Sequence, residues 1–488
     1  MYDSRHYRPP YSEPKQPHRM LYPFLGLLAF GLFVTTGLTM QTTRSQPESA
    51  HVPAAALNLQ ATKLSTDHVP YLPRFGKVLE KQFASLVTVN AAEGNLFYWF
   101  FESRVNPTLA STPVIVWLNG GPGASSMTGL LTEMGPYRIQ PDGSLTSHPH
   151  GWTNVGHMLF FDQPVGTGYT SAKNESGFVN SQFEMAAQLH VALTTFYTRH
   201  PEYEANPVVI AGESYAGKYV PNIAHYIHEQ NQKETHKINL WGVAIGNGEM
   251  KPLVQTVSVA DYALSLGLID QEQFVQHQAS LSKCAALMEQ GQLVDAFRVC
   301  QSTEDEIYRQ AGNPFIYDIR QQGNAFNELT KSLSEYFNLP ETRHALNIPP
   351  NTPWTSIDGS SYGADLAAPA IARHLLNDEM VEVPNAMLET LLDHYHVLFY
   401  AGNMDGSSCN HLGISRVVDQ LKWTGADAYH AAARTPWKVN GNVAGLAKES
   451  GKMAYVVITN SGHLVPTDQP EAALDMIRRF VARESFAA

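Results

Sequence analysis

The fold of this 488-residue chain is decided by residues 208–217, which read VVIAGESYAG. The apolar run at 207–211 predicts a buried strand, and helical spacing follows directly after Ser214. A serine at a sharp turn between strand and helix is strained, so its neighbours two before and two after must be small, as Gly212 and Ala216 are. An ordinary turn would also fit the pattern, but its setting favours a turn that lifts the hydroxyl clear of the sheet.

Outward from this stretch, short apolar runs alternate with helical patterns. The other predicted strands are 96–101, 113–118, 157–161, 240–245, 396–400 and 454–458, and the clearest helices are 181–200 and 471–481. This alternation predicts an α/β fold with a mostly parallel central sheet and helices on both faces. It breaks between about 251 and 385, where a helical cap insertion is predicted. No internal repeat is found.

Composition and charge exclude several classes of function. Apolar residues make up 43% of the chain and charged residues 16%, which is enough apolar sequence for a large core. The net charge of −12 argues against non-specific binding of nucleic acid. No CxxC or HExxH spacing is present, so no metal site is expected. Cys284 and Cys300 lie close enough in sequence for a disulfide, although two separate buried thiols fit equally well, and Cys409 is left over.

The N-terminus predicts export. Residues 1–19 are polar and basic, and residues 20–40 are apolar and long enough to span a bilayer once. The preceding basic residues place the N-terminus in the cytoplasm and the remainder outside. The length of the run favours an uncleaved membrane anchor over a cleaved signal peptide, which would leave the body secreted or periplasmic. Residues 41–68 have the composition of a linker, and the catalytic domain is predicted at 69–483.

Three further motifs each follow a predicted strand. In Asn119–Gly123 (NGGPG), successive glycines let backbone N–H groups approach a ligand closely, as in an oxyanion hole. Asp405 stands in the turn 402–406, and His463 in the loop 461–466. Taken alone, the first is an ordinary Gly-Pro turn, the second a common turn, and the third a solvated histidine.

The order of these residues changes that interpretation. Ser214, Asp405 and His463 follow one another in the chain order of α/β-hydrolases, and each stands just past a predicted strand. The carboxyl ends of parallel strands meet at one edge of a sheet, so the three side chains are expected to meet there. They predict a serine hydrolase with Ser214 as nucleophile, His463 as general base and acid, and Asp405 as the group that orients the histidine.

From about residue 69 to 483 the chain resembles the serine carboxypeptidase family. The segments that carry the resemblance are LFYWFFES (96–103), WLNGGPGASS (117–126), DQPVGTGY (162–169), GESYAGKYVP (212–221), AIGNG (244–248), YDIR (317–320), WKVNGNVAG (437–445) and GHLVPTDQPEA (462–472). The resemblance implies an α/β-hydrolase fold with a helical cap. It also implies release of single residues from the C-termini of peptides, without a metal or organic cofactor.

The resemblance also implies roles for residues around the triad. Oxyanion N–H groups would come from Gly121 and Tyr215. The terminal carboxylate of a peptide substrate would be held by Asn119, Gly120, Glu133 and Glu213. Homodimers are common in the family, and a homodimer remains open for this chain.

The two glutamates suggest a dependence on pH. Glu133 and Glu213, if side by side, cannot both ionise cheaply, so one stays protonated and can donate a hydrogen bond to the substrate carboxylate. As the pH rises, the pair loses this proton and repels the substrate. Hydrolysis is therefore expected to be best in mild acid and to decline through neutrality as KM rises.

Departures from the family put substrate preference in doubt. They are Ala124 in place of the usual cysteine, Asn403, Leu464, and the segment 84–86. The usual disulfide frame is missing, so the insertion is expected to be held by packing. The alternatives to a carboxypeptidase are an acyltransferase or an esterase on the same scaffold, or an inactive membrane-anchored binding protein.

Overall fold

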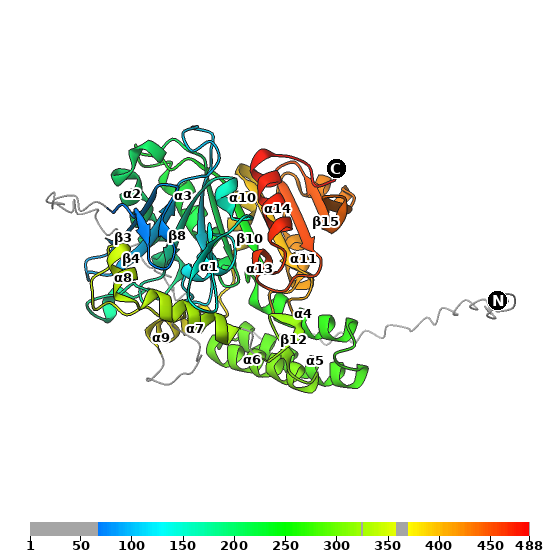
Figure 1. Ribbon diagram of the computed structural model, residues 1–488. Helices are drawn as coiled ribbons and strands as arrows, with labels where there is room; N and C mark the ends of the chain where they lie inside the picture. The colour runs from blue at the N-terminus through cyan, green and yellow to red at the C-terminus, as the bar shows by residue number, and fades with distance from the viewer. Residues whose placement is uncertain (1–66, 324–325, 358–368, 488) are drawn as a thin grey trace, which may run out of the picture. The chain divides into compact units, whose positions relative to one another are not determined.

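The computed structural model describes residues 67–323, 326–357 and 369–487, which lie within one compact unit from Ser65 to Ala488 (Figure 1). The predicted basic segment, the apolar anchor or signal, and nearly all of the predicted linker lie outside the described residues. In the described ranges, none of the helices has the length and hydropathy needed to cross a bilayer.

The core is a ten-stranded sheet with the order β14-β15-β16-β13-β10-β9-β5-β8-β4-β3. Its strands in chain order are β3 (Gln82–Thr88), β4 (Asn95–Phe101), β5 (Val114–Leu118), β8 (His157–Asp162), β9 (Val208–Glu213), β10 (Leu240–Gly246), β13 (His396–Gly402), β14 (Thr435–Val439), β15 (Asn442–Ser450) and β16 (Met453–Ile458). The six strands from β16 to β8 are parallel, and the edge strands are antiparallel. The predicted mostly parallel sheet is confirmed, whereas β3, β14 and β15 were not predicted. Small two-stranded sheets pair β1 (Tyr71–Leu72) with β2 (Gly76–Lys77) and β6 (Tyr137–Ile139) with β7 (Leu145–Ser147).

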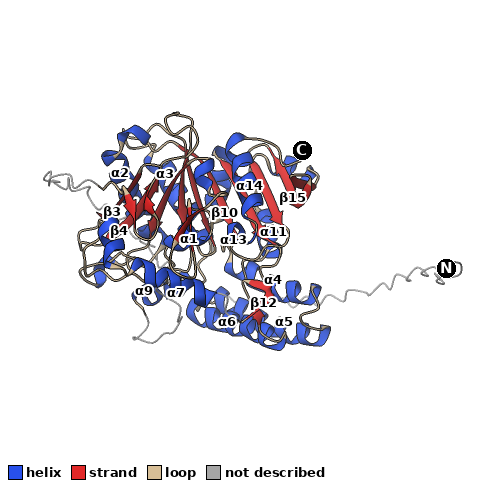
Figure 2. Cartoon of the chain, in the orientation of Figure 1, coloured by secondary structure: helices blue, strands red, loops and turns tan. Residues whose placement is uncertain are grey.

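Helices cover both faces of the sheet, as predicted (Figure 2). One face packs against α2 (Gln182–Arg199), α3 (Ala216–Gln230), α10 (Asn385–His394) and α11 (His411–Gln420), and the other against α1 (Met127–Thr132) and α14 (Pro470–Ala482). Two shorter helices are α12 (Ala426–Ala431) and α13 (Val465–Asp468).

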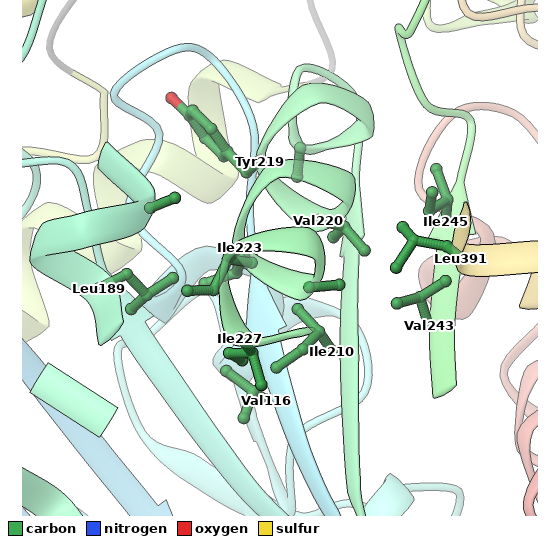
Figure 3. Close-up of a cluster of buried hydrophobic side chains, with 14 of the residues drawn as sticks. Val116, Leu189, Ile210, Tyr219, Val220, Ile223, Ile227, Val243, Ile245 and Leu391 are labelled. Carbon is green, nitrogen blue, oxygen red and sulfur yellow. The ribbon is translucent and has the colours of Figure 1, made fainter. Parts of the chain in front are cut away.

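Helix α3 packs against the middle of the sheet, and this packing fixes the position at which the helix begins. Val220 and Ile223 of α3 lie in the same buried cluster as Val116, Ile210 and Val243 of the three central strands (Figure 3). Side chains alternate along a strand, so the residues next to Val116, Ile210 and Val243 in sequence point to the core on the other face of the sheet. Continuous apolar runs are therefore buried on both faces, and the start of α3 is held at the carboxyl edge of the sheet.

The described part of the predicted insertion, between β10 and β13, is mostly helical. It contains α4 (Pro252–Ser265), α5 (Gln271–Glu289), α6 (Leu293–Gln310), α7 (Phe326–Phe337), α8 (Pro340–Ala345), α9 (Ala370–Leu375) and the hairpin of β11 (Pro314–Phe315) with β12 (Asp318–Gln322). Helices α4, α5 and α6 gather beyond one end of the sheet (Figure 1).

The cysteines settle one open alternative of the sequence analysis. Cys284 and Cys300 form a disulfide that joins α5 to α6, while Cys409 is a buried free thiol. The expectation that the insertion is held by packing alone is therefore wrong. Both half-cystines are buried among apolar side chains, so the bond reinforces a small core of the insertion itself.

Candidate active site

Ser214 occupies a strained turn between β9 and α3. Its φ of 63° lies in the left-handed region, which costs about 1 kcal/mol or more for a residue with a side chain. Main-chain hydrogen bonds hold it there, because Ser214 N donates to the oxygens of Gly246 and Asn247 at 3.1 Å and Ser214 O accepts from Glu249 N at 2.9 Å. A Cβ atom at Gly212 would lie only 2.5 Å from the Leu118 oxygen, so this position needs a glycine.

Asp405 and His463 are in direct contact at the ends of β13 and β16. The distance from His463 Nδ1 to Asp405 Oδ2 is 2.7 Å, and the Asp405 side chain is fully buried. Asn247 Nδ2 donates to the same oxygen at 2.8 Å. Ser407 donates to the other oxygen, Oδ1, through its backbone N–H at 3.0 Å and its hydroxyl at 2.7 Å. Both oxygens are thus satisfied, and the carboxylate is fixed in the orientation that an imidazole partner requires.

The loops that carry the acid and the imidazole also contact each other through their backbones. Met404 N donates to Ser461 O at 2.7 Å, and a Cβ atom at Gly402 would lie 2.0 Å from Gly462 O. The insertion contributes as well, since His463 N donates to Tyr317 O at 2.7 Å and the two rings lie 4.8 Å apart between centroids.

The NGGPG loop after β5 lies against Ser214. A Cβ atom at Gly120 would lie 2.4 Å from Tyr215 N and 2.8 Å from the Ser214 Cβ, so the backbones of the two loops touch. Gly121 has a φ of 110°, which a residue with a side chain rarely adopts. The structure therefore brings Gly120, Gly121 and Tyr215 together beside Ser214, while the oxyanion roles of Gly121 and Tyr215 stay predictions.

Glu133 and Glu213 form a buried carboxyl pair. Burial raises the pKa of both, and the charge of Glu133 raises the pKa of Glu213 further. Hydrogen bonds from Glu213 and Asn119 and the positive charge of Arg138 oppose that rise at Glu133. The pair as a whole therefore keeps a proton more readily than two exposed glutamates would.

Asn119 is oriented to serve this pair. Its Oδ1 accepts from Trp117 Nε1 at 2.8 Å and from Gly129 N at 3.1 Å, so its amide NH₂ must face the carboxyl groups. Asn119 Nδ2 donates to Glu213 at 2.9 Å and lies 3.4 Å from Glu133. All the residues predicted to bind a substrate carboxylate thus lie together, next to the serine loop.

Several residues near the site were missed as participants. Asn247 stood within the quoted AIGNG segment and Tyr317 within YDIR, but neither was given a role. Arg138 Nη2 donates to Pro466 O at 3.1 Å, which ties the neighbourhood of Glu133 to the histidine loop. A signal existed for Asn247, whose polar side chain follows a buried strand directly; Arg138 offered none.

A further buried carboxyl group, that of Glu304, lies near Asp405. Glu304 of α6 accepts a hydrogen bond from Ser408 N at 3.0 Å, and burial together with the charge of Glu249 raises the pKa of Glu304 to about 8. The raised pKa favours the neutral form of Glu304, which reduces the negative charge near Asp405.

Comparisons with known proteins agree with this arrangement. The family model described as serine carboxypeptidase matches residues 73–483. Mouse "Probable serine carboxypeptidase CPVL" is 34% identical over 413 residues, which cover 82% of this chain and 83% of the relative. "Serine carboxypeptidase-like 48" of Arabidopsis thaliana is also 34% identical, covering 80% of this chain and 76% of its own.

A solved structure supports the fold. The crystal structure of KEX1(delta)p, a prohormone-processing carboxypeptidase from Saccharomyces cerevisiae, superposes with a TM-score of 0.73 at 21% identity. The match covers 83% of this chain and 92% of that one. At this identity the likeness speaks for the fold alone, and it confirms the expected α/β-hydrolase architecture.

Proposed function

The chain belongs to the serine carboxypeptidase family and is a serine-type carboxypeptidase, and we propose that it releases C-terminal amino acids through an acyl-enzyme on Ser214. The observation that carries this proposal is the 2.7 Å contact between His463 and Asp405, at the same sheet edge as the strained Ser214.

In the proposed reaction, Ser214 Oγ attacks the carbonyl carbon of the last peptide bond while His463 takes the hydroxyl proton. The carbonyl oxygen becomes an oxyanion, which accepts hydrogen bonds from the N–H groups of Gly121 and Tyr215. The C–N bond then breaks as His463 gives its proton to the departing amino group. Water, activated by His463, attacks the acyl carbon and regenerates the Ser214 hydroxyl. Asp405 keeps the Nδ1 proton directed toward itself throughout.

The substrate's terminal carboxylate binds at Asn119, Gly120 and the Glu133/Glu213 pair. The carboxyl of the pair that stays protonated donates a hydrogen bond to it, and the Asn119 amide offers a second donor that does not titrate. Ionisation of the pair at higher pH would bring like charges together and weaken binding. Activity is therefore best in mild acid, and the substrates are peptides with a free C-terminus.

The decisive experiment compares two forms of one substrate. An N-blocked dipeptide with a free C-terminus and the same dipeptide with a C-terminal amide are incubated with the exported protein at about pH 5 and pH 7.5. We expect cleavage of the free acid only, faster at the lower pH, and loss of this cleavage in Ser214→Ala or after treatment with a serine-directed organophosphonate.

Other outcomes point to the alternatives. Cleavage of an ester analogue without cleavage of either dipeptide would indicate an esterase, and transfer of the acyl group to an added amine in preference to water would indicate an acyltransferase. Failure of the organophosphonate to label Ser214 would indicate a binding protein without activity.

We also propose that the catalytic body is exported, either anchored by residues 20–40 or released after their cleavage. The disulfide between Cys284 and Cys300 supports this, because such bonds persist mainly in oxidising compartments. The test is to determine the N-terminal residue of the mature protein and its partition between membrane and soluble fractions. An intact Met1 on a protein found in the cytoplasm would refute it.

A further inference from the structure

The last part of the insertion contacts the start of the nucleophile's helix. The turn η4 (Leu376–Asp378) follows α9, and its Asp378 Oδ2 accepts a hydrogen bond from the Tyr215 hydroxyl at 2.6 Å. Gln182 Nε2 of α2 donates to the same oxygen at 2.5 Å. Tyr215 directly follows the nucleophile, so this contact joins the insertion to the residue proposed to supply an oxyanion N–H.

A buried lysine strengthens the connection. Lys218 Nζ donates to the backbone oxygens of Asp378 at 2.9 Å and Glu379 at 2.7 Å, and it lies 4.4 Å from the centre of the Tyr215 ring. The fixed ammonium therefore holds both the ring and the chain segment that presents the carboxylate.

The group is almost entirely inaccessible to solvent. Tyr215 is 2% exposed, Lys218 1% and Asp378 5%. Water therefore cannot readily replace a hydrogen bond that is lost among them. Burial raises the pKa of the Tyr215 hydroxyl well above its usual value, so this group remains a donor. The Tyr215 ring thus has a single defined position.

The peptide before Tyr215 is held at the Ser214 oxygen, which accepts from Glu249 N at 2.9 Å and from Gly217 N at 2.8 Å, and the side-chain contact adds a second support at Tyr215. Its φ of −56° and ψ of −18° follow the strained left-handed turn at Ser214, and no side chain caps the first turn of α3. An oxyanion donor must lie within a few tenths of an ångström of its target to stabilise the transition state. A rotation of the peptide before Tyr215 would turn its N–H away.

We propose that Asp378 is a positioning residue that fixes Tyr215 through its hydroxyl and thereby aims the Tyr215 backbone N–H at the oxyanion. This rests on the proposed function, and it gives the insertion a role in the chemical step. Asp378 touches neither substrate nor reacting atoms. Its effect passes through one side chain.

The test is a double-mutant cycle between Asp378→Ala and Tyr215→Phe, with Asp378→Asn as the conservative variant. Each of the first two variants breaks the same hydrogen bond, so we expect each to lower kcat by about 10- to 100-fold with little change in KM, a smaller loss than that of a whole oxyanion donor. The double variant should lose no more than the worse single one. Asp378→Asn keeps an acceptor oxygen and should recover most of the loss.

Binding measurements separate positioning from general destabilisation. The affinity for a peptide boronic acid, which mimics the tetrahedral intermediate, should fall by the same factor as kcat, whereas a competitive inhibitor bound through its carboxylate should keep its affinity. Asp475→Ala is the control, because the Asp475 carboxylate lies outside the site, where it accepts from Trp437 Nε1 at 2.9 Å and pairs with Arg478 and Arg479, and it should lower the melting temperature without lowering kcat.

Three results would overturn the proposal: additive effects in the cycle, a rise in KM at constant kcat, or an unchanged affinity for the boronic acid. If Asp378→Ala does not fold, Tyr215→Phe alone breaks the hydrogen bond, and its kcat and its affinity for the boronic acid carry the test. An inactive wild-type enzyme would instead refute the proposed function.

Discussion

Replacing Asp405 with asparagine tests its proposed role in orienting His463, because the change exchanges one carboxylate oxygen for an NH₂ group. Ser407 N donates to Asp405 Oδ1 at 3.0 Å, and a backbone N–H cannot become an acceptor. The asparagine oxygen must therefore stay at the Oδ1 position, and the new NH₂ takes the position of Oδ2. There it faces two donors, His463 Nδ1 and Asn247 Nδ2.

Neither Asn247 nor His463 can accept a hydrogen bond from the new NH₂ without losing another hydrogen bond or the tautomer that catalysis needs. Asn247 Oδ1 accepts from Gly402 N at 3.1 Å, so a rotated Asn247 amide would leave that N–H unpaired. His463 accepts from the new NH₂ only by moving its proton from Nδ1 to Nε2, and this tautomer cannot take the Ser214 proton. We expect kcat to fall by about 10⁴-fold, equivalent to about 5 kcal/mol of transition-state stabilisation.

The assay is the initial rate of hydrolysis of the N-blocked dipeptide at saturating concentration, with the melting temperature measured alongside. Ser407→Ala is the matched control, because it removes one hydroxyl donor from the same carboxylate at 2.7 Å and leaves the histidine contact intact. The kcat of this control should fall by no more than about tenfold. An Asp405→Asn variant within tenfold of wild type, at unchanged stability, would refute the assignment of Asp405.

Three further perturbations test the electrostatics and the disulfide. Glu133→Gln should flatten the rise of KM between pH 5 and pH 7.5, because an amide removes one of the two like charges, whereas a profile identical to wild type would contradict the carboxyl-pair mechanism. Glu304→Gln should raise the stability toward urea at pH 7.5 more than at pH 4. The reason is that the folded pKa of about 8 exceeds the unfolded value, so wild-type stability falls as the pH rises between them; equal effects at both pH values would contradict this. The double variant Cys284→Ser/Cys300→Ser should lose about 3 kcal/mol in urea unfolding, the value for a loop of 16 residues, and a loss below about 1 kcal/mol would mean that the bond adds little.

The parts of the fold that could be predicted from sequence are those buried on both faces. Strands such as 114–118 show continuous apolar runs because both sides pack against helices. β3 escaped prediction because it alternates between buried and partly buried residues at the edge of the sheet, and β15 is mostly only partly buried. Strands at the edge of a sheet have a weaker apolar pattern, so continuous apolar runs do not identify them.

The residues of the site likewise fall into those that could be predicted from the sequence and those that could not. Ser214, Asp405 and His463 were singled out because each follows a strand, and the parallel sheet makes those ends converge. Asp378 carries no motif and reaches Tyr215 across 163 residues of sequence, through a turn whose place depends on the whole insertion. A contact of that kind follows from tertiary packing, which no local pattern records.

The seam between Gly402 and Gly462 has a consequence for the diversification of such enzymes. A side chain at Gly402 would collide with Gly462 O, and one at Gly462 would collide with Tyr317 O, so close main-chain packing helps to set the spacing between acid and imidazole. Nearby pocket walls can therefore be rebuilt for new leaving groups while the proton-transfer machinery keeps its dimensions. Mutations that change substrate preference can then accumulate without altering the residues that transfer the proton.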